Sequence, residues 1–196
     1  MNKKFALRQL FQIYKDPRVY VKTLSMCALL AAAGVVLDFF GINIPMFGAS
    51  KGIALNLGLV PVILSGMLFG PIWGGMVGAV QDLAGVLLKG DGTPFLGFTL
   101  TVFCVGFFAG LFAYFFPKLS EKWYGLACFC VFIALFSNIT NSFWLTFLVP
   151  GKTFMAFAVT RLISVPFSAV AYTLVLYIVY KKVFLPLPFF NYRKVS

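Results

Sequence analysis

Four long stretches of this chain contain no charged residue, and they determine whether the chain folds in water or in a lipid bilayer. They cover residues 52–81, 92–117, 123–151 and 162–180. A run of 18 or more apolar residues is a candidate for a helix that crosses a bilayer, and each stretch is longer than that. Hydrophobic residues make up 61% of the chain, charged residues 11%, and the mean hydropathy is +0.97. The sequence therefore predicts an all-α membrane protein surrounded by a lipid bilayer.

The net charge of +11 lies mainly at the two ends of the chain. Ten of the sixteen Lys and Arg residues occur in the first 22 residues or after residue 180. Positive charge that flanks membrane spans is typical of cytoplasmic segments, whereas a nucleic-acid site needs a basic patch on a folded surface. We therefore expect no nucleic-acid partner and both termini on the cytoplasmic side of a prokaryotic plasma membrane.

The number of crossings depends on residues 53–89, where Gly70-Pro71 either kinks one long helix or separates two short ones. The other expected spans are 22–40, 95–116, 123–149 and 154–180. One helix over 53–89 gives five crossings, and two helices give six. Only six crossings keep both basic termini on the same side. The prediction is a compact, multi-pass bundle of six transmembrane helices with both termini cytoplasmic.

This topology divides the chain into three parts. We expect residues 1–21 to form a cytoplasmic amphipathic leader, residues 22–183 a six-helix transmembrane domain, and residues 184–196 a cytoplasmic tail. The loop at 41–52 contains Pro, Asn, Ser and several glycines, so it can fold over the outer end of the bundle as a lid.

The residues available for catalysis are few. The chain has no histidine and only five carboxylates, and no two carboxylates have the close helical spacing of membrane transferases or proteases. The four cysteines lie inside apolar runs and are interpreted as packing residues. We therefore expect no catalytic residues, no metal site, no cofactor in this chain, and no enzymatic activity.

The informative residues are the polar ones within the expected spans, because polar groups at membrane depth usually serve pockets, pathways or ion pairs. Arg161 and Asp82 each lie about two turns below the outer end of a span. Asn138 and Asn141 share one face of the fifth helix, with Trp144 one turn above Asn141. All five belong to the outer half of the bundle.

Each of these residues also has a purely structural interpretation. Arg161 can snorkel to the interface, and the two asparagines can hydrogen-bond between helices. Asp82 can form an ion pair with Lys89 or Arg161. Lys51, in the expected lid, and Lys89 are both expected at the outer end of the helix bundle.

Small residues four positions apart let helices approach closely. Gly74 and Gly78, and likewise Gly106 and Gly110, are interpreted as packing pairs inside the bundle. The pair formed by Ala28 and Ala32 suits either internal packing or contact with a partner.

Several segments together resemble the substrate-binding S components of energy-coupling-factor vitamin transporters, in particular the folate-type branch. The resemblance rests on the stretch 59–71 (LVPVILSGMLFGP) followed by Gly74, Gly78 and Asp82, and on the run 94–101 (PFLGFTLT). It also rests on the basic aromatic leader, on Ala28 and Ala32, and on Arg161-Leu162-Ile163 followed by Pro166.

The resemblance implies six helices and a vitamin bound from outside beneath the first loop. It implies that Ala28 and Ala32 dock onto a transmembrane coupling subunit, driven by two cytoplasmic ATPase subunits that use ATP. The expected substrate-binding residues are Lys51, Asp82, Lys89, Phe98, Thr99, Asn138, Asn141, Trp144 and Arg161. Arg161 and Lys51 would hold carboxylate, the asparagines would hydrogen-bond, and Phe98 and Trp144 would supply apolar or stacking surface.

Folate is the first expectation for the substrate. Pantothenate or another small vitamin precursor is the alternative, since Arg161 and Lys51 suit a carboxylate in either case. From a different class, a membrane scaffold that transports nothing would bind no ligand.

Overall fold

The structure is a computed structural model that describes residues 17–39, 42–44, 53–89, 95–120, 122–148 and 154–179. Lys51, most of the expected leader and lid, and the expected tail lie outside these ranges. The side chain of Lys89 also lies outside the description, although its backbone ends a helix.

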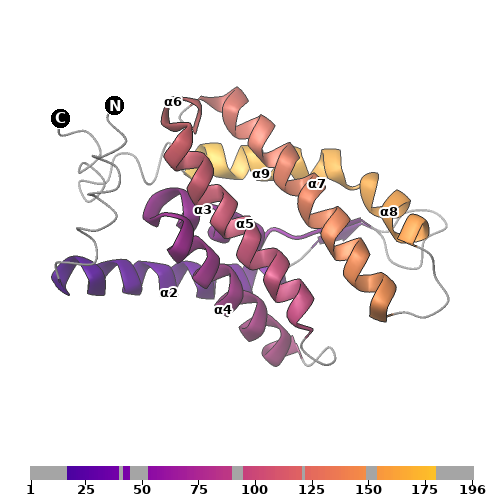
Figure 1. The fold of residues 1–196 in the computed structure, drawn as a ribbon, viewed down its shortest axis with the longest axis horizontal. Helices are drawn as coiled ribbons and strands as arrows, with labels where there is room; N and C mark the ends of the chain where they lie inside the picture. The colour runs from indigo at the N-terminus through magenta and orange to yellow at the C-terminus, as the bar shows by residue number, and fades with distance from the viewer. Residues whose placement is uncertain are drawn as a thin grey trace.

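The described residues form a bundle of helices, and the chain passes from one end of the bundle to the other six times (Figure 1). The first five crossings are α2 (Pro17–Phe39), α3 (Leu59–Phe69), α4 (Pro71–Lys89), α5 (Leu96–Phe115) and α7 (Trp123–Leu148). The last consists of α8 (Phe154–Leu162) and α9 (Val165–Ile178), and the short α6 (Pro117–Ser120) joins α5 to α7. By length and composition, α2, α4, α5 and α7 can each span a membrane, and α3 and α9 are shorter apolar helices. The six-helix prediction is confirmed.

Gly70 is the reason why 53–89 forms two helices and not one. Its φ of 102° lies in the region that L side chains avoid, and it is the one positive φ in the described chain. Its N–H still donates to the carbonyl of Gly66 at 2.9 Å, which closes α3. Pro71 then begins α4 at a position where a missing N–H costs nothing.

The last crossing differs from the continuous helix expected over 154–180. It breaks between α8 and α9, where both the N–H and the hydroxyl of Ser164 donate to the carbonyl of Arg161, at 3.0 and 2.6 Å. Pro166 lies in the first turn of α9 and lacks the N–H that an unbroken helix would use there. The break therefore follows one residue after Arg161, since α8 ends at Leu162.

Glycine sets the close packing of α3, α4 and α5. A Cβ on Gly74 would lie 2.5 Å from the Cα of Gly66 in α3 and 2.5 Å from the carbonyl oxygen of Gly106 in α5. A Cβ on Gly78 would lie 2.6 Å from the carbonyl oxygen of Val102. The internal-packing interpretation of these glycines is confirmed, since no side chain fits between the backbones.

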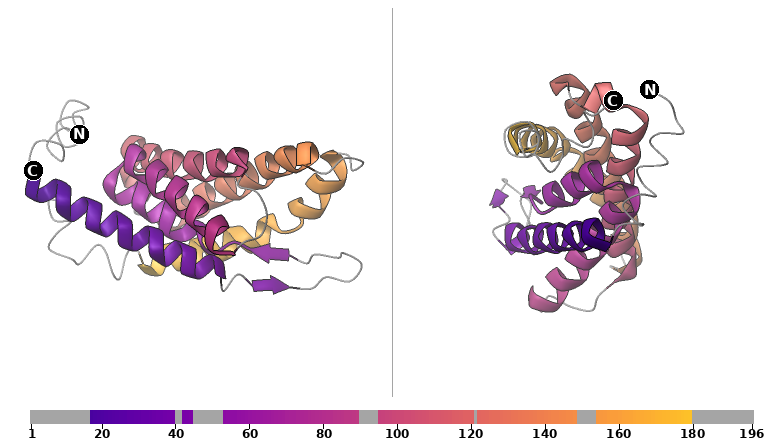
Figure 2. Two further views of the ribbon diagram at one scale, coloured as in Figure 1. Left: turned by 90° about the horizontal axis from the view of Figure 1, so that it is seen from below. Right: turned by 90° about the vertical axis from the view of Figure 1, so that its left-hand side faces the viewer.

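The two ends of the bundle differ in structure. Strand β1 (Ile42–Ile44) pairs antiparallel with β2 (Ile53–Leu55), with Asn43 opposite Ala54. This hairpin lies at the same end as α8, and α6 lies at the other end (Figures 1 and 2). We call these the hairpin end and the α6 end.

Candidate functional site

The hairpin half of the bundle contains most of the polar residues that the sequence singles out. They come from the last turns of α4, the first turns of α5, the last turns of α7, and α8, and the described ones are Asp82, Phe98, Thr99, Asn138, Asn141, Trp144 and Arg161. Four separate elements therefore bring their polar residues to one end.

Asp82 and Thr99 form a direct link between α4 and α5. The Thr99 hydroxyl donates to a carboxylate oxygen of Asp82 at 2.6 Å, and the contact is partly buried. The distance is typical of a charge-assisted hydrogen bond. Thr99 is a partner of Asp82 that the sequence did not suggest. The side chain of Lys89 lies outside the description, so the ion pair of Asp82 with Lys89 stays a prediction.

Trp144 belongs to an aromatic cluster made of Phe95, Phe98, Phe143 and Trp144. Its indole N–H donates to the hydroxyl of Thr101 at 3.2 Å, which connects α7 to α5. The ring of Phe95 meets those of Phe98 and Trp144 at centroid distances of 5.7 and 5.6 Å, both edge-on. The first turn of α5 and the last turns of α7 thus share one apolar wall.

Helix α5 separates these two groups of residues. Thr99 and Thr101 are two positions apart, so their side chains point about 200° apart around the helix axis. Thr99 accordingly bonds to α4, and Thr101 to α7. The structure therefore does not bring Asp82 together with Trp144.

The two asparagines of α7 have different surroundings. The side-chain amide of Asn138 donates to the carbonyl of Ala134 in its own helix at 2.8 Å. Asn138 also lines a small cavity of about 150 Å³ between α7 and α8, together with Met155, Ala158 and Leu162. The Oδ1 of Asn141 is buried and has no hydrogen-bond partner among the described residues. Such an orphaned acceptor is costly unless something donates to it, so Asn141 is the stronger candidate for a ligand contact.

Arg161 is half-buried at the end of α8, directly before the helix break. No described carboxylate forms an ion pair with its guanidinium. An arginine within a membrane helix that has no counter-ion among the described residues is suited to a bound anion.

A buried polar network that sequence reasoning missed lies between α2, α3 and α4. The side chain of Gln81 is 2% exposed, and its amide donates to Asp38 at 3.3 Å and to the carbonyl of Gly58 at 2.9 Å. Its Oε1 lies against Gly34 and has no hydrogen-bond partner among the described residues. Two ordinary polar residues 43 positions apart give no periodic signal, and only the packing of the helices joins them.

Ala28 and Ala32 lie on the exposed side of α2, next to the exposed Leu29 and Val36. They do not pack inside the bundle, unlike the glycines of α4 and α5. The exposed position leaves this pair accessible to lipid or to a partner protein.

Comparison with known families agrees with this architecture. The model of the family described as "ECF-type riboflavin transporter, S component" matches residues 18–183, which is nearly the whole described bundle. The chain belongs to the S components of energy-coupling-factor transporters. As an S component it is a non-enzymatic, multi-pass membrane protein of a bacterial importer, and the resemblance stated from its motifs is confirmed. Membership implies a vitamin substrate and the partners of an energy-coupling module with its ATPases.

Two relatives of this S component carry the same description. It is 36% identical over 132 residues to "Folate transporter FolT" of Clostridium novyi (strain NT), covering 67% of this chain and 74% of the relative. It is 24% identical over 153 residues to the protein of that name from Leuconostoc mesenteroides, covering 76% and 78% of the two chains.

Solved structures match the S component over most of its length. A crystal structure of FolT bound with folic acid superimposes with a TM-score of 0.66 at 29% identity, covering 83% of this chain and 94% of the other. An S component for biotin superimposes with a TM-score of 0.64 at 20% identity, covering 92% and 95%. The second likeness shows the shared fold alone.

Proposed function

We propose that this S component captures folate at its hairpin end, facing the outside of the cell, and delivers it through an energy-coupling module. The observation that carries the choice of vitamin is the 36% identity to a folate transporter over two thirds of the chain. The likeness to FolT bound with folic acid supports the same choice at the level of the fold.

The polar residues of the hairpin half suit the chemistry of folate. Folate combines a pterin ring that carries N–H donors, a second aromatic ring, and carboxylates. The Arg161 guanidinium, which has no described counter-ion, can hold a carboxylate with paired hydrogen bonds. The unpartnered Oδ1 of Asn141 can accept from an N–H of the vitamin, and Phe98 and Trp144 can contact its rings.

The remaining sequence-based assignments stay predictions. Lys51 would reach the ligand from the lid and Lys89 from the end of α4. Asp82 and Thr99 bond to each other, so a role in substrate binding would require that this pair also contacts the vitamin or exchanges partners. Asn138 would donate or accept a hydrogen bond to the vitamin from the cavity between α7 and α8.

The proposal includes the route of delivery. The hairpin end faces outwards and both termini lie in the cytoplasm, so the α6 end is cytoplasmic. The S component docks through the exposed Ala28 and Ala32 onto a transmembrane coupling subunit, and two cytoplasmic ATPases supply the energy by using ATP. The small side chains would let the helices of the two proteins approach closely.

The first test is direct titration of the purified, detergent-solubilised protein with folate, pantothenate, riboflavin and biotin. We expect saturable binding of folate that is at least about tenfold tighter than that of any other vitamin, equivalent to roughly 1.4 kcal/mol. Tighter binding of another vitamin would overturn the choice of folate while leaving the S-component role intact. Absence of binding across the whole set would count against vitamin capture by this chain.

The second test replaces Arg161. Loss of a charged hydrogen bond in Arg161→Ala should weaken folate binding by about tenfold to a hundredfold. Arg161→Lys should recover part of the loss, because it restores the charge but not the paired geometry. Lys22→Ala, at an exposed position in the first turns of α2, is the control and should bind like the wild type. An Arg161→Ala protein with unchanged affinity would contradict the proposed anchor.

A further inference from the structure

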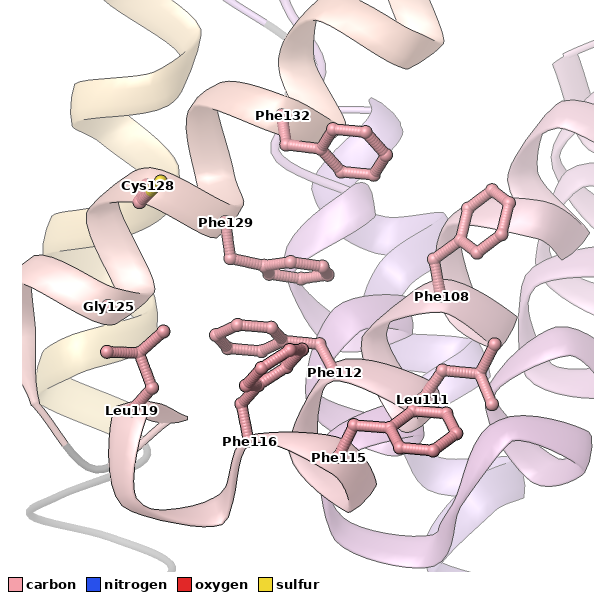
Figure 3. A pocket seen from close by; sticks show the side chains of 10 residues that line it. All are labelled: Phe108, Leu111, Phe112, Phe115, Phe116, Leu119, Gly125, Cys128, Phe129 and Phe132. Carbon is pink, nitrogen blue, oxygen red and sulfur yellow. The ribbon is translucent and has the colours of Figure 1, made fainter.

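An apolar groove lies far from the proposed vitamin site, between α5, α6 and α7 in the α6 half of the bundle (Figure 3). It has a volume of about 380 Å³. The floor is formed by Phe112 and Phe129, whose rings stack at a centroid distance of 4.3 Å with 10° between their planes. Phe108 and Phe132 line one end and Leu119 the other, and the side chains point toward the space between the helices.

The turn that joins α6 to α7 lies next to the groove, because Leu119 before the turn and Gly125 after it both line the groove. Lys122, in this turn, is fully exposed, and its ammonium lies 5.4 Å from the centre of the Tyr124 ring. A hydrogen bond with Tyr124 raises the pKa of Lys122 above its ordinary value. An exposed lysine is a cation at physiological pH. Residues 117–122 carry two lysines and one glutamate in sequence, a net positive charge.

Two interfacial aromatic residues mark the depth of this mouth. Trp123 is 65% exposed and Tyr124 is 47% exposed, both at the start of α7. Exposed Trp and Tyr are enriched at the level of lipid headgroups, where one end of the side chain is apolar and the other is wet. We therefore expect this end of the groove to lie at headgroup depth and the rest of it within the hydrocarbon region.

We propose that this groove is a binding site for one anionic phospholipid of the adjacent leaflet. An acyl chain occupies the phenylalanine-lined groove, and the phosphate of the headgroup pairs with Lys122 at its mouth. The fully apolar walls exclude a polar ligand, and the cation at the mouth selects an anionic headgroup over a zwitterionic one. The site is independent of the identity of the vitamin.

The test is native mass spectrometry of the full chain extracted from vesicles that contain equal amounts of phosphatidylglycerol and phosphatidylcholine. The wild type should retain one phosphatidylglycerol in preference to phosphatidylcholine. Lys122→Ala should reduce that preference by about fivefold, the equivalent of one lysine near an anionic surface. Lys22→Ala, which removes another exposed lysine, is the charge control and should retain the wild-type preference.

The acyl-chain site is tested by filling the groove. Cys128 is exposed and lines it, so Cys128→Trp should displace the chain and abolish the retained lipid. Val131→Trp places the same side chain on an exposed position of α7 outside the groove, and it should keep the lipid. Thermal unfolding curves of both variants establish that each is folded before the comparison is made.

Two results would overturn the proposal. Equal lipid retention by Cys128→Trp and Val131→Trp would exclude the groove as the site. A wild type that retains no lipid, or retains both headgroups equally and is insensitive to Lys122→Ala, would exclude selection by the cation. Neither result bears on folate binding, which is measured separately.

Discussion

The hydroxyl of Thr99 donates to the carboxylate of Asp82 at 2.6 Å and ties the first turn of α5 to the last turns of α4. The pair lies in the hairpin half, so it is placed to serve either the packing of the helices or the vitamin. A substitution that removes the Thr99 hydroxyl distinguishes these two roles, because the stability of the protein and its affinity for folate are measured independently.

We predict that Thr99→Val lowers the free energy of unfolding by about 1.5–3 kcal/mol, since it leaves a half-buried carboxylate without this donor. Thr146→Val is the control, because the Thr146 hydroxyl donates only to the carbonyl of Ser142 in its own helix, and it should change stability by less than about 0.5 kcal/mol. Thermal unfolding in detergent measures both. Loss of folate affinity by Thr99→Val at wild-type stability would instead assign the pair to ligand binding.

The Gln81 network should stabilise the junction of α2, α3 and α4. Gln81→Met keeps the shape of the side chain but leaves Asp38 and the Gly58 carbonyl without this donor, so we expect a loss of about 1–3 kcal/mol. Leu83→Met, at an exposed position on the same helix, should be nearly neutral. Equal melting temperatures for the two variants would mean that water replaces the amide at no cost.

The glycines of the bundle should respond oppositely to alanine according to the space around them. A Cβ on Gly106 would collide with the backbone of Gly74, so Gly106→Ala should lower the melting temperature or prevent folding. A Cβ on Gly85 would meet nothing within 4 Å, so Gly85→Ala should stabilise α4 by about 0.5–1 kcal/mol through the lower helix propensity of glycine. The yield and melting temperature of both proteins test this, and similar behaviour would contradict the close approach of α4 and α5.

Docking and vitamin binding should be separable. Ala28→Trp combined with Ala32→Trp should abolish uptake of labelled folate by cells that contain the whole transporter, because bulky side chains prevent close helix approach. Folate affinity of the isolated S component should stay unchanged, since both alanines are exposed and α2 packs mainly against α3 and α4. Val131→Trp on α7 is the control for both assays. Parallel loss of uptake and affinity in the alanine variant would indicate a damaged bundle instead.

Sequence reasoning succeeded for the features that repeat or stand out along the chain. The charge-free runs predicted the helices. The even number of crossings that two basic termini require predicted the separation of α3 from α4 at Gly70-Pro71. It did not predict the break between α8 and α9, although Pro166 was visible, because a proline in an apolar run is compatible with either a kinked or an interrupted helix. The hydrogen bonds from Ser164 to the carbonyl of Arg161 show that the helix is interrupted and not merely kinked.

The sequence predicted which polar residues lie toward the same end of the bundle, but not which of them contact one another. The sequence correctly placed Asp82, Asn141, Trp144 and Arg161 toward one end, because the distance of a residue from the end of its helix follows from counting. It did not suggest Thr99 as a partner of Asp82, and the structure shows that hydrogen bond. Which side chains bond between two helices depends on how each helix is rotated about its own axis. The sequence hardly constrains that rotation in a helix that is apolar on the side facing lipid as well as on the side facing the bundle.

The sequence by itself determined that this is a membrane protein, how many times the chain crosses the bilayer, and the family to which its motifs belong. These follow from local quantities: the hydropathy of a run, the position of a glycine or proline, and the order of residues in a motif. Only the tertiary structure decided that α5 holds Asp82 on one side and Trp144 on the other, that Gln81 reaches Asp38, and that Ala28 and Ala32 face outwards. Those relations arise when backbones meet at the glycines, and that contact sets the rotation and depth of each helix relative to its neighbours.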